Sequence, residues 1–237
     1  MSHFAYHVAG GEGRRISASE ALDAKEGLVW IHLATNDAEA QQWLAEKAEL
    51  PDYIIDSLTA TETRPRCDAV GDGAFLNLRG RIAEDEQGDD ALGSVRIWAT
   101  AGRVISVTRK RLTALDQVIA SVESATVDDP GDLITEFATA ITAELDPEVS
   151  DLGDNLDDCE ADLDADRVFH LRRVVTKVRV AAIQYRRFLT PQRAALEKLA
   201  ALPCPWLEDD DRLHLAAAAD RAARMAEELE SIRERAA

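Results

Sequence analysis

The chain has 237 residues, 46% of them hydrophobic, and carries a formal net charge of −18. This length supports one large domain or two modest ones with a sizeable core. The charge excludes nucleic acid and anionic lipid headgroups as favourable partners and favours cations and basic proteins. Three isolated cysteines argue against a disulfide framework and a thiolate zinc site. The sequence has no signal peptide and no stretch of about eighteen apolar residues, so we expect a soluble, cytosolic chain.

The first half of the chain alternates between strand and helix patterns. Residues 28–33 (LVWIHL) are apolar almost throughout, which is typical of a strand covered on both faces. Residues 37–60 have a helical pattern. Alternation and β-branched residues predict further strands, which are residues 4–8, 74–82, 94–101 and 103–109. These patterns predict an α/β fold with a mixed sheet over residues 1–128.

From about Thr113 onward no strand pattern is present, and residues 129–237 are expected to form long helices. Apolar residues every three or four positions from Leu133 to Leu163 predict one long helix, which Pro147 should kink or break. A second helix is predicted over residues 167–200 and a third from Glu208 to the end. The expected inner face of the third helix is alanine-rich and comprises Ala216, Ala217, Ala219, Ala223 and Ala226.

The stretch LDDCEADLDAD, residues 156–166, holds six acids. A calcium loop would need a glycine at its sixth position and a glutamate at its twelfth, and neither is present. Leu156, Cys159 and Leu163 continue the apolar face of the long helix. The favoured interpretation is therefore a solvated helix face, and a loose carboxylate site for Zn²⁺ or Mg²⁺ is the alternative.

Charge is strongly segregated along the helical half. Residues 112–166 contain no lysine or arginine, whereas residues 167–198 contain nine, with a single acid, Glu197. Two consecutive helices of opposite charge are expected to lie side by side as an antiparallel hairpin. Much acid would remain unpaired, which suggests that the negative potential has a use.

No catalytic or phosphate-binding motif is present, so an enzyme has no support from the sequence. Two pairs at helical i,i+4 spacing, Asp166 with His170 and Asp210 with His214, can each offer two ligands to zinc. Two ligands make half a site, and an ordinary surface pair is the alternative. Lone His32 is expected in the sheet as a core residue. The candidate metal ligands are Asp158, Asp162, Asp166, His170, Asp210 and His214.

Residues 61–80, TETRPRCDAVGDGAFLNLRG, carry the most specific pattern in the chain. An Arg-Pro-Arg, a Gly-x-Gly turn and a strand ending in Leu-x-Leu-Arg resemble the cytoplasmic domain of ZntB-type transporters of the CorA divalent-cation superfamily. The stretches LVWIHL, RVISVTRKRLTALDQV, LGDNLDDCE and FLTPQRAALEKLAALPCPWLEDDDR are also similar to that family. The resemblance covers nearly the whole chain.

The resemblance implies a homopentameric funnel on the cytoplasmic face of the inner membrane. It implies an αβα sandwich with a mixed β-sheet, then long antiparallel helices and a C-terminal stalk helix that leads into membrane spans. The sequence ends at Ala237 before any span, so a fragment of a longer protein is expected. Arg64, Pro65, Arg66 and Arg79 are expected to be structural, holding a sheet edge or a neighbouring subunit through pairs with acids.

The sequence is consistent with two functions. The first is the cytoplasmic domain of a transporter for zinc, with magnesium as the alternative ion, that gathers or senses cations and couples to pore gating. Its partners would be other copies of itself and, through absent spans, the membrane; no organic cofactor, nucleic acid or enzymatic activity is expected. The second is a soluble acidic α/β scaffold that binds basic partners.

Overall fold

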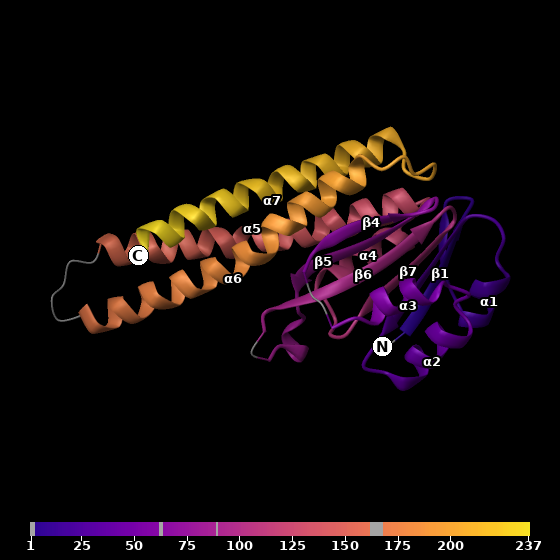
Figure 1. Cartoon of the computed structure of the whole chain (residues 1–237), viewed down its shortest axis with the longest axis horizontal. Helices are drawn as coiled ribbons and strands as arrows, with labels where there is room; N and C mark the ends of the chain where they lie inside the picture. The colour runs from indigo at the N-terminus through magenta and orange to yellow at the C-terminus, as the bar shows by residue number, and fades with distance from the viewer. Residues whose placement is uncertain (1–2, 62–63, 89, 162–167) are drawn as a thin grey trace.

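A computed structural model of the chain describes residues 3–61, 64–88, 90–161 and 168–237 (Figure 1). The strands are β1 (His3–Ala9), β2 (Glu12–Ile16), β3 (Leu28–Ala34), β4 (Arg66–Val70), β5 (Gly73–Arg81), β6 (Leu92–Thr100) and β7 (Arg103–Thr108). The helices are α1 (Ala18–Asp23), α2 (Ala38–Glu46), α3 (Asp52–Thr59), α4 (Ala114–Glu123), α5 (Pro130–Ala161), α6 (Val168–Ala200) and α7 (Asp209–Arg235), with a 3-10 turn η1 (Glu84–Glu86). Among these residues, no helix combines the length and apolar character needed to cross a bilayer.

The seven strands form one mixed sheet in the order β2-β1-β3-β7-β6-β5-β4. β3 and β7 are parallel, and every other neighbouring pair is antiparallel. Helices α1 and α3 pack on one face, and α4, α5 and α6 on the other. The fold is therefore the expected αβα sandwich with a mixed sheet, followed by long helices. The division at residues 128 and 129 stays a prediction, and one apolar cluster contains residues from both sides of it.

Trp30 lies at the centre of the core between the sheet and the long helices. Its ring is fully buried, its centroid is 5.7 Å from that of Phe137 on α5, and its Nε1 donates to Ser106 Oγ at 2.8 Å. The ring nitrogens of His32 lie 2.8 Å from Ser106 Oγ and 3.3 Å from Thr108 Oγ1. Burial lowers the pKa of His32 to about 3, because desolvation disfavours the charged form. His32 is therefore a satisfied core residue, as expected.

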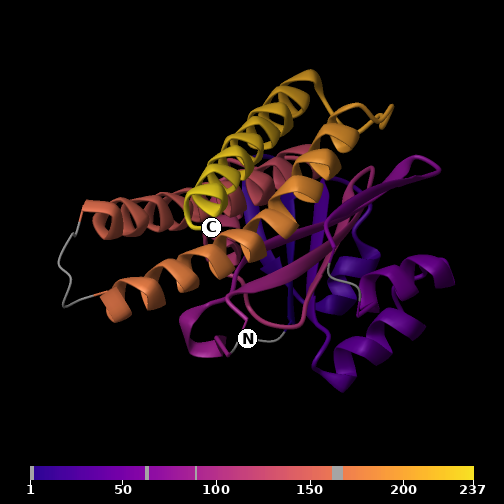
Figure 2. The same ribbon diagram turned by 60° about the vertical axis from the view of Figure 1, so that its left-hand side comes forward.

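The three long helices extend beyond the sheet (Figures 1 and 2). α7 packs against both α5 and α6, and the far ends of α5 and α6 diverge past the end of α7 in both views. α5 is continuous through Pro147, so the helix does not break there, and the alternative of a kink at Pro147 stays a prediction. The predicted apolar face of α5 is buried over most of its length, whereas Leu163 lies outside the described residues.

The inner face of α7 differs from the predicted one. Ala216 and Ala217 are exposed, and Ala223 and Ala226 are half-buried. The buried side chains are Asp211, Leu215, Ala218, Ala219, Ala222, Met225, Leu229 and Ile232. We call the apolar members of this set the α7 seam. The prediction placed the alanine-rich face inward. The larger apolar residues near both ends of the helix instead determine which face is buried.

Gln192 on α6 provides a hydrogen-bond acceptor to the sheet at the point where the edge strand β4 ends. β4 pairs with β5 only as far as Asn77, so the backbone N–H of Arg79 has no strand partner on that side. That N–H donates to Gln192 Oε1 at 2.7 Å, and the Gln192 side chain is buried. The side chain thus replaces one hydrogen bond of the missing strand.

The Gln192→Leu substitution should lower the free energy of unfolding by about 1–3 kcal/mol, because it leaves a buried N–H without an acceptor. Urea denaturation followed by circular dichroism measures the change. Gln42→Leu is the matched control, because Gln42 is exposed and bonds only its neighbour Glu46 in the described structure. Equal stability of the two variants would contradict the assigned role of Gln192.

Candidate metal sites and charged surfaces

The described part of the acidic stretch is helical. Residues 156–161 form the last turns of α5, with Leu156 buried, Cys159 half-buried and Asp157, Asp158 and Glu160 exposed. The acids therefore lie on a solvated helix face, as favoured for this part of the stretch. Asp162 and Asp166 lie outside the described residues.

The four described candidate ligands are split between two ends of the molecule. Asp158 and His170 lie near the far ends of α5 and α6, and both are exposed. Asp210 and His214 lie at the start of α7, beside the sheet, with His214 Nδ1 3.8 Å from Asp210 Oδ2. A helix of this length spans about 40 Å, so these residues do not converge on one site. Their role as metal ligands stays a prediction.

Arg235 in the last turn of α7 binds two acids of α5. Its Nη2 donates to Glu160 Oε2 at 2.7 Å and its Nε to Glu160 Oε1 at 3.2 Å, and Nη2 also donates to Asp157 Oδ1. These carboxylates raise the pKa of the guanidinium. Two of the acids expected to attract metal ions are thus paired with a cation of the same chain. The sequence prediction missed this pair because it is 75 or more residues apart along the chain.

Three carboxylates that the sequence analysis did not single out meet at the starts of α5 and α7. Ligand oxygens of Asp129, Asp132 and Asp211 lie within 4.8 Å of one another. Asp211 is 3% exposed and lies against Gly131, where an added Cβ would be 2.0 Å from Asp211 Oδ2. The absence of a side chain at Gly131 therefore leaves the space that the Asp211 carboxylate occupies.

These carboxylates also cap the two helices. The backbone N–H of Glu208 donates to Asp211 Oδ2 at 2.8 Å, and that of Asp132 donates to Asp129 Oδ1 at 3.0 Å. Such bonds satisfy first-turn donors. Burial, followed by the charges of Asp129, Asp132 and Glu208, nevertheless raises the pKa of Asp211 to about 6. Capping accounts for the cluster without a metal ion.

The opposite charges of α5 and α6 pair mainly with groups on α7, although the two helices also contact each other directly. Among the described residues no ion pair joins α5 to α6, although the sequence predicted partial neutralisation between them. Instead, Arg186 on α6 pairs with Glu230 on α7 at 3.1 Å, and Arg235 on α7 pairs with α5. Helix α7 therefore presents acid to the basic helix and arginine to the acidic helix.

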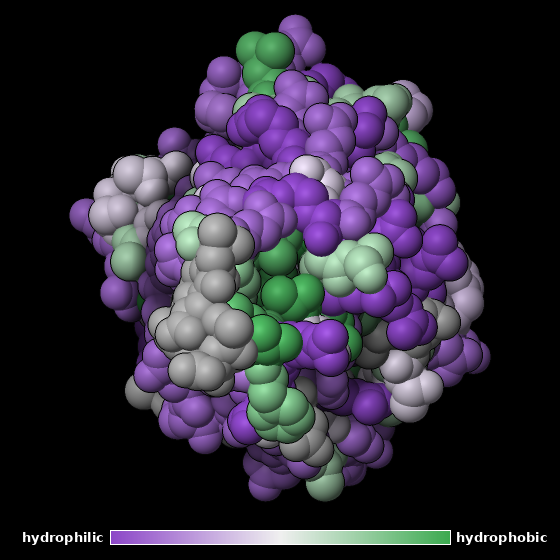
Figure 3. Space-filling model, turned by 90° about the vertical axis from the view of Figure 1, so that its left-hand side faces the viewer, coloured by the Kyte–Doolittle hydropathy of each residue, from purple (hydrophilic) through white to green (hydrophobic). Residues whose placement is uncertain are grey.

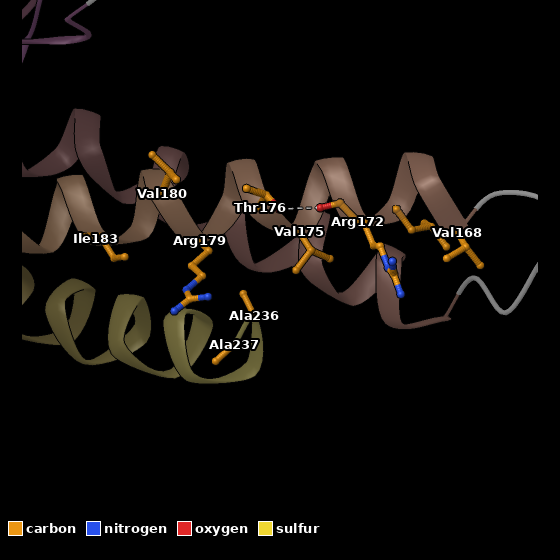
Figure 4. Close-up of a pocket in the computed structure, with 10 residues that line it drawn as sticks. Val168, Arg172, Val175, Thr176, Arg179, Val180, Ile183, Ala236 and Ala237 are labelled. Carbon is orange, nitrogen blue, oxygen red and sulfur yellow. Dashed lines mark hydrogen bonds between the residues drawn. The ribbon is translucent and has the colours of Figure 1, made fainter.

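An apolar groove runs along the far half of α6 beside the end of α7. It is about 690 Å³ in volume, and its apolar lining includes Val168, Leu171, Val175, Val180 and Ile183. Figure 3 shows hydrophobic surface in a hollow at this end of the molecule, with hydrophilic surface around it. Arg172 and Arg179 flank the apolar residues in Figure 4. The groove combines apolar contact area with positive charge.

The Arg-Pro-Arg segment lies at the sheet edge. The Arg64 carbonyl accepts from Asn77 Nδ2 at 2.9 Å, and Pro65 is buried. Arg66 Nε donates to Asp68 Oδ2 at 3.1 Å, and its guanidinium lies 4.9 Å from the centroid of the Phe75 ring. Arg79 is buried and contacts the Phe188 ring of α6 instead of a carboxylate.

The raised pKa of Asp211 predicts how stability depends on pH. Because folding raises this pKa from 3.8 to about 6, the folded protein binds the proton more tightly than the unfolded chain. The resulting stabilisation is present below about pH 4 and is lost as pH rises through 6. Asp211→Asn should reduce this dependence and stabilise the protein by about 1–3 kcal/mol at pH 7.

Urea denaturation at several pH values measures this effect. Asp210→Asn is the control, since Asp210 is exposed on the same turn. An Asp211→Asn variant with the same pH profile as the wild type would show that Asp211 does not titrate in this way.

Comparison with known proteins identifies relatives along nearly the whole chain. The zinc transport protein ZntB of Yersinia enterocolitica is 27% identical over 229 residues, and that of Klebsiella pneumoniae is 29% identical over 229 residues. In both cases the match covers 96% of this chain and 70% of the relative.

Solved structures share the fold. The full-length CmaX protein superposes with a TM-score of 0.82 at 29% identity, covering 100% of this chain and 74% of CmaX. The ZntB cytoplasmic domain from Vibrio parahaemolyticus has a TM-score of 0.80 at 16% identity, covering 100% of this chain and 94% of that domain. The profile of a family described as CorA-like Mg²⁺ transporter protein matches residues 25–237. The chain therefore belongs to the CorA-like family, whose members are transporters and not enzymes.

Proposed function

We propose that this chain is the cytoplasmic funnel domain of a homopentameric transporter for divalent cations, with zinc favoured over magnesium, on the cytoplasmic face of the inner membrane. The observation that carries the proposal is the match of 96% of the chain to relatives named as zinc transport proteins. The family profile covers residues 25–237 and names magnesium, which keeps Mg²⁺ as the second candidate ion.

The charge of the domain supports a role in gathering cations. Each chain carries a net charge of −18, and several copies around one axis would add their potentials. Salt screens each charge beyond about 8 Å at physiological ionic strength, so only acids close to the ion path contribute. The exposed acids of α5 that have no cationic partner in the described structure, such as Asp154 and Asp158, are available for this role.

The bridge from Arg235 to Asp157 and Glu160 supports a route from ion occupancy to helix position. A divalent cation on these carboxylates would compete with the guanidinium, because both need the same oxygens. Occupancy would therefore release the last turn of α7 from α5. Such competition shifts the population between a state in which Arg235 binds α5 and a state in which the last turn of α7 is released. The shift is limited by the difference in cation affinity between the two states.

Titration calorimetry with ZnCl₂ and MgCl₂ tests this coupling. The wild-type chain should bind at least one of the two ions with micromolar to millimolar affinity. Arg235→Gln should bind that ion severalfold more tightly, because the competing cation is gone. Asp157→Asn combined with Glu160→Gln should bind it more weakly, because two carboxylates are lost.

Arg233→Gln is the matched control, because Arg233 pairs with Glu230 and Glu234 on its own helix. Absence of binding of either ion up to millimolar concentration would refute the sensing role. Identical affinities for Arg235→Gln and Arg233→Gln would refute the competition. Transport itself is tested by zinc and magnesium uptake into liposomes that contain the product of the complete reading frame.

Exposed apolar side chains support self-association. Phe169 is 82% exposed, and Val180, Ile183 and Leu213 are also exposed on α6 and α7. Exposed apolar surface of this kind is typical of interaction sites. Ile183→Asp should shift the mass of the assembled full-length protein toward smaller species, as measured by native mass spectrometry.

Tyr53→Asp is the control for the association experiment. Tyr53 is 51% exposed on α3, away from the long helices, so this variant should retain the wild-type mass. A wild-type protein that is monomeric in the membrane extract would refute the pentamer. An unchanged assembly in Ile183→Asp would show that this face of α6 is not its interface.

A further inference from the structure

Arg79 carries a charge into the interior without a carboxylate partner. Its side chain extends from the edge of β5, and the residue is 7% exposed. Nη2 donates to the Leu92 carbonyl, and the guanidinium carbon lies 4.1 Å from the centroid of the Phe188 ring. Nε is buried and has no hydrogen-bond acceptor in the described structure. Buried charges are normally paired, so this guanidinium calls for a counter-ion.

A second arginine lies at the same place. Arg187 directly precedes Phe188 on α6 and is exposed, and its guanidinium carbon is 6.0 Å from the centroid of the same Phe188 ring. No described carboxylate lies within ion-pair distance of Arg79 or Arg187. Burial lowers the pKa of Arg79, and the charge of Arg187 adds a smaller lowering, while the charge of Asp90 acts in the opposite direction. Two like charges thus share one aromatic ring in a protein that is strongly acidic elsewhere.

A cavity of about 170 Å³ opens between these arginines. Gln184 and Tyr185 from α6 and Leu92 from β6 also line it, as does Asp90 at its rim. Asp90 is exposed and forms no ion pair in the described structure, so its carboxylate offsets the charge of Arg79 without contacting the guanidinium. The cavity has room for an ion of a few heavy atoms and has guanidinium and amide donors around it.

We propose that this cavity binds a small oxyanion, held between the guanidinium groups of Arg79 and Arg187. A phosphate, a sulfate or a carboxylate presents oxygens that match the planar fork of donors on each arginine. The anion would supply the missing counter-charge to Arg79 and link β5 to α6. This inference is independent of the transport proposal, because it depends on the residues of this cavity and not on divalent cations.

The test is titration with sodium phosphate, sodium sulfate and sodium acetate, each against sodium chloride at equal ionic strength. Differential scanning fluorimetry should show a rise in melting temperature with at least one oxyanion that chloride does not produce. The relative rise in melting temperature with the three anions distinguishes a phosphate-like ligand from a carboxylate. Isothermal titration calorimetry with the most effective anion then gives its affinity.

Arg187→Gln should weaken that affinity about tenfold or more, because one charge-assisted contact is lost. Arg186→Gln is the matched control on the adjacent position, where the side chain pairs with Glu230. Asp90→Asn should strengthen binding, since it removes the carboxylate at the rim. No oxyanion-specific stabilisation, or equal affinities in Arg187→Gln and Arg186→Gln, would overturn the proposal.

Discussion

The α7 seam is the contact on which the arrangement of the long helices depends. Leu215, Met225, Leu229 and Ile232 are buried between α5 and α6, while small residues between them let the helices approach closely. Each large side chain contributes about 1.5–3 kcal/mol when fully buried. Because this apolar contact fixes α7 against both helices, it also fixes which charged groups meet. The acidic and basic helices contact α7 through opposite charges instead of neutralising each other.

This arrangement leaves charge available at two separate places. On α5, exposed acids extend beyond the carboxylates that Arg235 binds, which is the feature that the cation-gathering proposal uses. At the sheet edge, Arg79 and Arg187 meet around Phe188 without an ion pair to a described carboxylate, which is the feature that the oxyanion proposal uses. In both places the apolar packing of the helices holds like charges together, and an ion from solution can relieve the repulsion.

Local sequence patterns predicted the elements that carry strong periodicity. The buried strand β3, the β6–β7 hairpin and the three long helices follow directly from apolar spacing. Local patterns alone did not predict the edge strands β2 and β4, because edge strands are short and carry charged residues that hide the alternation. The family resemblance supplied the layer arrangement and the transporter class, which periodicity does not contain.

The charged contacts of the candidate sites could not be predicted in the same way. Arg235 with Glu160, Asp211 with Asp129, and Arg79 with Phe188 all join residues that are far apart in the sequence and meet only through packing.

The most direct test of the account is hydrogen exchange along α7 with and without saturating MgCl₂ or ZnCl₂. We expect faster exchange in the last turn of α7 when the ion is bound, and unchanged slow exchange around Leu215. Uniform exchange along α7, unaffected by either ion, would contradict an α7 that is held by its seam and clasped to α5 by Arg235.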